Sequence, residues 1–545
     1  MRGARSAKWV ATAIVVALAA TACGGSDDGE GGDGGDNTSA GNPDGIVRID
    51  GGEPQNPLVP TNTNEQFGAL VVQNVFSKLL DFDDQGQIYM VAAESVEPSE
   101  DNGTWTVTLK EGWTFHDGTP VTAQSYVDAW NWAANIDNNQ NNSFWFADIV
   151  GYEDVHPAEE GAAPTADAMS GLQVVDDLSF TIELTTPVSY YDYKLGYDAF
   201  TPLPESFYDD PEAFGEHPVG QGPYEFTAWN HGESIELARY EDYAGEPAKN
   251  GGIHIASYDS LEAAYTDLQS GNLDIIRQVA PRDLPLYRQD LGEDHSVAQP
   301  YNGIQTIVPV WYEWEDTDPQ VLQGVSMAID RETITQTVLD GSRTPADSFV
   351  PPGVFGYQEG ASNGITDFNP EEARRLVEAG GGIPGDEITI QYNSDGGHQE
   401  WVEAVCNSII ETLDVECVGD AKVDFDTDLE AREANEVQSM YRGGWFADYP
   451  LNVNFLKELY HSEAQSNYGR FDNAEVDELF SEGDAAATLE DTAQAYADAE
   501  QVLWEEMPAI PLWFNNVNGG WGENVSNVAF NSAGQPVLTE VTVNE

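Results

Sequence analysis

The chain has 545 residues, of which 96 are acidic and 21 are basic, giving a formal net charge of −75 at neutral pH. Such a charge repels nucleic-acid phosphates and anionic lipid headgroups, which argues against either as a binding partner. The length suffices for two or three domains with their own cores, and aromatic residues at 11% allow large rings both in the interior and at a ligand site.

The excess of acidic residues also predicts a dependence on salt. Like charges on one chain repel each other unless ions screen them, and the Debye length falls to about 3 Å near 1 M salt. Lysine contributes only seven of the basic residues. We therefore hypothesise that the protein functions in a saline habitat.

The first residues have the features of a signal peptide. Basic residues precede a predominantly apolar run at 9–20, which suits a signal-peptide core but is too short to span a bilayer. Small residues then lead to Cys23, as in a bacterial lipobox, although Ala20 stands where Leu is usual. We predict a lipoprotein signal peptide at 1–22 and acylation of Cys23, with ordinary secretory cleavage near Ala22 as the alternative.

A polar segment follows the cysteine. It consists mainly of Gly, Asp, Ser and Asn and lacks the aliphatic residues that a core needs. Residues 23–45 are therefore predicted to form a flexible tether that holds a globular body outside the membrane. No later segment is apolar enough to form a transmembrane helix.

The body begins with alternating strand and helix signals. Residues 105–109 alternate as a strand, and 110–120 form a turn punctuated by glycine. Thr122 is suited to cap a helix with apolar residues at helical spacing. Further along, 260–270 reads as a helix ended by Gly271, and a short strand is expected next, at 273–276.

Two later segments complete the pattern. Asn369 is placed to cap a helix, with Pro370 at its first position and Gly380 just past its end. The alternation of strands and helices indicates mixed α/β layers. No period of 20–50 residues repeats, which excludes a solenoid.

Two cysteines remain in the body. Cys406 falls on a predicted helix and Cys417 on a short strand after it. In a secreted protein such a pair favours a disulfide, which would stabilise the fold by roughly 3 kcal/mol in the chain-entropy model. Free thiols are the alternative, and no histidine close in sequence supports a metal site.

Asp424, Asp426 and Asp428 alternate like the ligands of a calcium loop. The glycine at the sixth position and the distal glutamate of such a loop are missing. We therefore interpret the three residues as a solvated strand face, and we predict no metal and no cofactor. Nucleophile elbows, zinc-protease motifs and phosphate-binding loops are also absent from the sequence.

The segment 441–450 concentrates groups suited to a ligand. It holds Arg442, Asp448 and four aromatic rings within ten residues, and Pro450 ends it. The rings supply flat apolar walls, and the opposite charges suit the two ends of a zwitterion. An aromatic strand end with a solvated aspartate is the alternative interpretation.

Five motifs, taken in order, resemble the peptide-type (family 5) solute-binding proteins of ABC importers, and the resemblance covers nearly all of the mature chain. They are KEGWTFHDGTPVTA at 110–123, PVGQGPY at 218–224, LQSGNLD at 268–274, AIDR at 328–331 and MPAIPL at 507–512.

The resemblance implies an α/β fold: a two-lobed, periplasmic-binding-protein-like clamshell of type II, cluster C, with an additional domain in lobe I. Hinges are expected near Tyr301 and Pro511, and the lobes would close around the solute by hinge motion. The implied boundaries are lobe I at 46–88, 195–300 and 511–545, the extra domain at 89–194, and lobe II at 301–510.

The resemblance also assigns ligand contacts within 441–450 and one just before it. Asp448 would pair with the free α-ammonium of a peptide, and Trp445 would line a side-chain pocket. Arg442 would bind the peptide carboxylate, with Arg432 as a second basic contact. Phe446 is included among the ligand contacts.

Four further contacts are expected from elsewhere in the chain. His398, which follows the YNSD sequence at 392–395, would meet the carboxylate end of the peptide, although a surface loop histidine is the alternative. Phe144 and Trp145 would reach the ligand from the extra domain, and Glu65 would add a contact from lobe I.

The implied function is capture of oligopeptides by a monomeric, lipid-anchored protein at the outer face of the cell membrane. Its partners would be the peptide and the permease subunits of an ABC transporter. Residues 451–454 depart from the Asp-Pro that family members often carry there, which leaves an oligosaccharide or another solute as an alternative. A secreted glycoside hydrolase is a further alternative, because 96 acidic residues make many carboxylate pairs possible.

Overall fold

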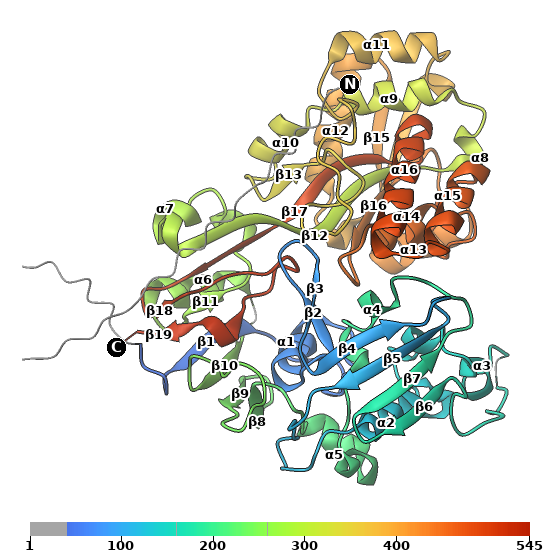
Figure 1. Cartoon of the computed structure of the whole chain (residues 1–545). Coiled ribbons are helices and arrows are strands. Elements are labelled where there is room, and N and C mark those ends of the chain that lie inside the picture. The colour runs from blue at the N-terminus through green and yellow to red at the C-terminus, as the bar shows by residue number, and fades with distance from the viewer. Residues whose placement is uncertain (1–40, 160, 259, 545) are drawn as a thin grey trace, which may run out of the picture. The chain divides into compact units, whose positions relative to one another are not determined.

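The computed structural model describes residues 41–544 apart from 160 and 259 (Figure 1). The described residues form one compact unit, which contains every element named below. The predicted signal peptide, Cys23 and most of the predicted tether lie outside the described residues. Within the described part of the chain, no helix has both the length and the apolar character needed to cross a bilayer.

A mixed sheet of eleven strands organises this unit. Two long strands, β12 (Ser296–Pro309) and β17 (Ile510–Trp521), pair antiparallel at its centre. The order is β15-β14-β16-β12-β17-β11-β1-β10-β9-β8, with β13 beside β17. The other strands within predicted lobe II are β13 (Arg343–Pro345), β14 (Glu387–Asn393), β15 (Glu416–Lys422) and β16 (Met440–Phe446). Those within predicted lobe I are β1 (Ile46–Gly51), β8 (Tyr224–Asn230), β9 (Ser234–Arg239), β10 (Gly252–Ser257) and β11 (Ile275–Ile276).

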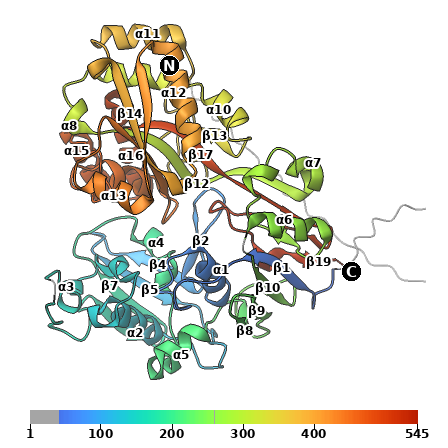
Figure 2. The same cartoon turned by 180° about the vertical axis from the view of Figure 1, so that it is seen from behind.

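A second, antiparallel sheet lies within the predicted extra domain (Figure 2). Its order is β4 (Ala93–Pro98), β5 (Thr104–Leu109), β7 (Ser179–Glu183) and β6 (Leu172–Asp176). Helix α2 (Ala123–Ala134) packs on β6 and β7, and Trp130 meets Phe180 edge to face at 5.3 Å. Thr122 caps α2 through a capping box, as the sequence predicted.

The predicted helix ends are confirmed in two further places. Helix α6 (Leu261–Ser270) has Ser260 as its N-cap and ends at Gly271, whose φ of 77° is left-handed. Helix α11 (Pro370–Ala379) begins after Asn369, which accepts a hydrogen bond from the backbone N–H of Glu372. The strand predicted at 273–276 is shortened to β11.

The remaining helices cover the faces and edges of the two sheets. They are α1 (Gln66–Val75), α3 (Tyr152–Val155), α4 (Tyr191–Lys194), α5 (Pro211–Glu216), α7 (Tyr287–Leu291), α8 (Trp311–Trp314), α9 (Pro319–Met327), α10 (Arg331–Thr337), α12 (Gln399–Leu413), α13 (Phe425–Glu433), α14 (Asn452–Tyr460), α15 (Ala474–Asp484) and α16 (Leu489–Glu506). Short strand pairs are β2 (Leu80–Phe82) with β3 (Ile88–Met90) and β18 (Val525–Ser526) with β19 (Thr542–Val543).

A disulfide bond joins Cys406 on α12 to Cys417 on β15, with the sulfurs 2.12 Å apart. The helix and the strand are where the sequence predicted them. The bond fastens α12 to the edge strand that it packs against.

The interpretation of Asp424–Asp428 as a strand face is wrong. The segment begins α13, and Asp424 caps this helix by accepting a hydrogen bond from the N–H of Thr427. Asp428 is fully buried and forms an ion pair with Arg432 one helical turn later. An i, i+4 acid–base pair favours a helix, and this pairing outweighed the alternation on which the strand interpretation rested.

The AIDR motif at 328–331 has a structural role. The Arg331 guanidinium is buried and donates to the carbonyls of Pro511, Ser326 and Thr366 at 2.8–2.9 Å. It thereby ties α9 and α10 to the start of β17. Burial lowers the pKa of Arg331 to about 9, because these partners are carbonyls rather than carboxylates.

Candidate ligand-binding site

A pocket of about 670 Å³ lies against the part of the main sheet that falls in predicted lobe II. Its floor is formed by β12 and β16, which pair antiparallel with Ile304 opposite Trp445 and Ile307 opposite Arg442. Gly443 and Gly444 leave the strand surface open, and a Cβ at Gly443 would lie 2.5 Å from Thr306 Oγ1. The pocket thus follows residues 441–446 of the segment 441–450 that the sequence singled out.

Arg442 and Arg432 both line this pocket, but their side chains have different partners. Arg442 Nε donates to Asn393 Oδ1 at 3.0 Å, and its guanidinium lies over the Phe425 ring at 5.4 Å. Arg432 is buried, pairs with Asp428, donates to the Arg442 carbonyl at 3.0 Å and lies over the Tyr441 ring at 4.4 Å. Much of the Arg432 charge is therefore compensated within the protein.

His398 also lines the pocket, at the N-terminal end of α12. Its Nδ1 accepts a hydrogen bond from Trp401 Nε1 at 3.1 Å. A ring with Nδ1 as acceptor carries its proton on Nε2 when it is neutral. His398 is half-buried, and both its proposed contact with a peptide carboxylate and the loop-histidine alternative stay open.

Trp445 and Phe446 extend the pocket toward the end of β16. Trp445 Nε1 donates to Asn454 Oδ1 at 3.0 Å, which fixes the indole. Phe446 stacks on Tyr301 with ring centroids 5.8 Å apart, yet 57% of its surface is exposed. An exposed ring held by a second ring is a ready apolar contact for a ligand.

Asp448 lies two residues beyond Phe446. Its N–H donates to Asn454 Oδ1 at 3.0 Å, and its Oδ2 accepts from Asn454 Nδ2 at 3.1 Å. The residue reaches solvent, but surrounding protein atoms partly desolvate the carboxylate and raise its pKa, while the Asn454 hydrogen bond and the Lys194 charge act in the opposite direction. Asn454 therefore orients both Trp445 and Asp448.

Like Asp448, the remaining predicted contacts do not line the pocket. Trp145 is buried and stacks on Tyr197 at 4.0 Å, while the neighbouring Phe144 is 61% exposed. Tyr197 interacts electrostatically with Asp448, which places this aromatic pair on the Asp448 side. Glu65 is the N-cap of α1 and accepts from the N–H groups of Phe67 and Gly68 at 2.8 Å, so its carboxylate is occupied by the helix.

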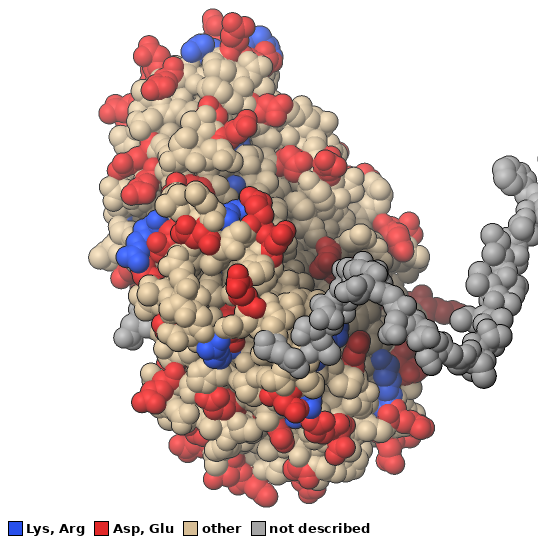
Figure 3. Space-filling view, turned by 90° about the vertical axis from the view of Figure 1, so that its left-hand side faces the viewer, with Lys and Arg blue, Asp and Glu red and all other residues tan. Residues whose placement is uncertain are grey.

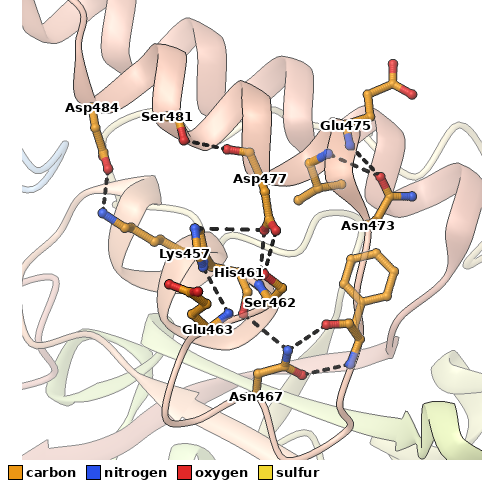
Figure 4. Close-up of polar contacts among 12 residues, drawn as sticks. Lys457, His461, Ser462, Glu463, Asn467, Asn473, Glu475, Asp477, Ser481 and Asp484 are labelled. Atoms are coloured by element: carbon orange, nitrogen blue, oxygen red, sulfur yellow. Dashed lines mark hydrogen bonds and ion pairs between the residues drawn. The ribbon is translucent and has the colours of Figure 1, made fainter.

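A polar network fixes the loop 461–471, which forms another wall of the pocket (Figure 4). Asn467 donates to the Phe471 carbonyl at 2.8 Å and accepts from the Phe471 N–H at 3.0 Å. Ser462 donates its hydroxyl to Asp477 on α15 at 2.5 Å. The wall is therefore held in place by the protein itself.

Sequence reasoning missed several pocket residues. Tyr301 was named only as a hinge candidate, and Gln305 and Arg343 were not named at all, yet all three line the pocket. Asn454 was noted only as part of a departure from the family pattern. Arginine is scarce in this chain, and that scarcity was the available signal for Arg343.

Comparisons with known proteins give the family. The model of the bacterial extracellular solute-binding proteins, family 5 (middle part), matches residues 87–467. The chain belongs to this family. It is 24% identical to the oligopeptide-binding protein OppA of Bacillus subtilis over 88% of this chain and 89% of the relative. It is 26% identical to the periplasmic oligopeptide-binding protein OppA of Salmonella typhimurium, over 86% and 87%.

Solved structures show the same fold. The unliganded open form of the periplasmic murein tripeptide-binding protein MppA superposes with a TM-score of 0.79 at 21% identity, covering 91% of this chain and 97% of that one. The Haemophilus influenzae OppA complex with the peptide RPPGFSPFR gives 0.68 at 21% identity, covering 93% and 100%. The predicted fold class, a two-lobed clamshell, is confirmed. The family consists of solute-binding proteins, so this chain is a binding protein and not a glycoside hydrolase.

Proposed function

We propose that this family 5 protein captures oligopeptides and delivers them to an ABC transporter permease. The observation that carries the proposal is the placement of opposite charges on β16 and just beyond its end. Arg442 lines the pocket, and Asp448 follows six positions later, two residues past the last residue of β16. A zwitterionic peptide matches that order, with its carboxylate toward Arg442 and its ammonium toward Asp448.

Neutral side chains in the same pocket suit a peptide main chain. Gln305, Asn393 and Asn515 line the pocket with amide groups. Amide contacts and bridging waters bind a peptide backbone with little regard to side chains. Relatives named as oligopeptide-binding proteins give independent support.

The proposed location is the outer face of the cell membrane. Acylation at Cys23 and the polar segment after it would hold the body there as a monomer, within reach of a permease. Replacement of Cys23 by Ala is expected to release the protein into the medium of the producing cells, and retention on the membrane would contradict the anchor.

Native mass spectrometry of the purified protein tests the ligand class. We expect co-purified peptides, and isothermal titration calorimetry with a free tetra-alanine peptide should show binding without cleavage. A co-purified oligosaccharide, favoured by the exposed ring of Phe446, would overturn the peptide assignment while leaving the family unchanged.

A further inference from the structure

Arg343 is the pocket residue whose charge the protein leaves least compensated. Its Nη1 donates to the Ser342 carbonyl at 2.7 Å, and no ion pair to it occurs among the described residues. The side chain is partly buried, and burial lowers its pKa while the nearby Tyr301 hydroxyl raises it. Partial burial has removed part of the hydration of this guanidinium, and no carboxylate of the described residues replaces it. An opposite charge on a ligand would therefore stabilise the side chain.

Other buried or partly buried arginines of the protein have partners within the described structure that Arg343 lacks. Arg48, Arg277 and Arg432 each pair with an aspartate in the described part of the chain. Arg331 is more deeply buried, but carbonyls surround its guanidinium. With 96 acidic residues available, the protein has compensated most cations that it buries, whereas Arg343 faces the ligand pocket.

Strand pairing shows which end of the pocket Arg343 serves. Arg343 on β13 is opposite Asn515 on β17, and the next residue, Thr344, is opposite Phe514. Phe514 is in turn opposite Ile304 on β12, which is opposite Trp445. Arg343 is thus level with the Trp445–Phe446 end of β16, three strand spacings or about 14 Å across the sheet.

This position separates Arg343 from the proposed carboxylate contact. Arg442 lies three to four residues back along β16, about 10–13 Å away in the strand direction. A peptide with its carboxylate at Arg442 would therefore present a different group to Arg343. Tyr301 and Asn515, which line the same end, are neutral hydrogen-bonding groups suited to flank an anion.

We propose that Arg343 binds an acidic side chain near the amino-terminal end of the peptide, so that the site selects acidic peptides. The inference rests on the proposed function, because it needs a peptide held between Arg442 and Asp448. The acidic surface repels such peptides at long range, and the selectivity would therefore arise from the local contact within the pocket.

The test compares tetrapeptides that differ by one charge. Alanine peptides with Glu or Gln at the first, second or third position are titrated into the wild type and into Arg343→Gln by calorimetry. In the wild type, one Glu peptide should bind about tenfold or more tightly than its Gln counterpart, as for hydrogen bonds to charged groups. Arg343→Gln should abolish that preference and change the affinity for tetra-alanine less than threefold.

Arg374→Gln is the matched control, because it removes the same charge from an exposed position on α11. It should keep the preference for Glu, and the melting temperatures of both variants should show that they are folded. Arg343→Lys should retain part of the preference, since it keeps the positive charge.

Three outcomes would overturn the proposal. If the wild type binds tetra-alanine but treats Glu and Gln alike at every position, Arg343 has no such role and the proposed function stands. If Arg343→Gln weakens short peptides with a free carboxylate but not their amides, Arg343 binds the α-carboxylate instead. If no peptide binds the wild type, the proposed function fails and this inference fails with it.

Discussion

At the scale of single residues, Asp448 carries the proposed recognition of the peptide ammonium. Its carboxylate is held by Asn454 and partly desolvated, which raises its pKa and makes an incoming cation favourable. The sequence identified Asp448 through its place after Trp445. Asn454, which holds both side chains, was recognisable only after folding had brought α14 beside the end of β16.

Asp448→Asn is the residue-scale test of recognition. It keeps the shape of the side chain but removes the charge, so free-amine peptides should lose about 100-fold or more in affinity, as when one partner of a buried ion pair is removed. The N-acetylated peptides should bind the variant and the wild type alike. Equal losses for both peptide sets in calorimetry would contradict the ammonium contact.

Asp192 on α4 should make stability depend on pH. Burial raises the pKa of Asp192 to about 7 from an ordinary 3.8, so the folded state holds its proton more tightly than the unfolded state. Its contribution to stability is therefore fully present below pH 3.8 and is lost as pH rises toward 7.

Asp192→Asn removes the loss of stability that ionisation of Asp192 causes at high pH. In urea unfolding the variant should gain free energy of unfolding over the wild type at pH 8, and the gain should shrink at pH 5.5. The exposed Glu205→Gln removes one surface charge and serves as the control. A gain that is the same at both pH values would exclude titration of Asp192 as its cause.

At the scale of elements, the PVGQG motif at 218–222 is explained by close packing. A Cβ at Gly220 would lie 2.0 Å from the Val75 carbonyl oxygen at the end of α1, and one at Gly222 would lie 2.7 Å from it. The Gly222 N–H donates to the same oxygen at 2.8 Å. The glycines are therefore required by a backbone-to-backbone contact.

Gly220→Ala should consequently destabilise the protein by about 3 kcal/mol, since a backbone atom cannot rotate away as a side chain can. Gly103→Ala is the matched control, because its Cβ would meet ordinary contacts at 3.4 Å or more. Thermal unfolding of the two variants checks this expectation, and equal melting temperatures would contradict it.

Element prediction succeeded where capping residues and periodicity agreed, as at α2, α6 and α11. It failed at 424–428, where three aspartates alternate as on a strand. Alternating aspartates alone do not distinguish a strand face from a helix. In this helix one aspartate is the N-cap and another pairs with an arginine one turn later. The pairing of Asp428 with Arg432 decided for the helix.

At the scale of the whole molecule, acidic side chains are spread over the surface view, with few basic ones between them (Figure 3). With a net charge of −75, repulsion between the acidic side chains destabilises the compact folded state. Potassium chloride at 1 M shortens the Debye length to about 3 Å, from about 10 Å at 0.1 M.

We therefore expect the melting temperature to rise between 0.1 and 1 M potassium chloride. Chloride is preferred to sulfate, which stabilises most proteins through exclusion from the surface. Sucrose at equal osmolality gives the control, and it should stabilise less than the salt. A melting temperature that stays constant or falls with salt would contradict the saline hypothesis.

The sequence by itself determined the family and the α/β class, and it singled out the segment 441–450, of which residues 441–446 line the candidate pocket. These features depend on local patterns: capping residues, glycines at close contacts and an ordered set of motifs. Only the tertiary structure decided which arginines are paired with an aspartate within the protein and which are not. Arg432 lies within ten residues of Arg442 but is neutralised by Asp428, whereas Arg343, a hundred residues away in sequence, faces the same pocket. Charge compensation depends on distance in space, which strand pairing across β12 and β17 sets.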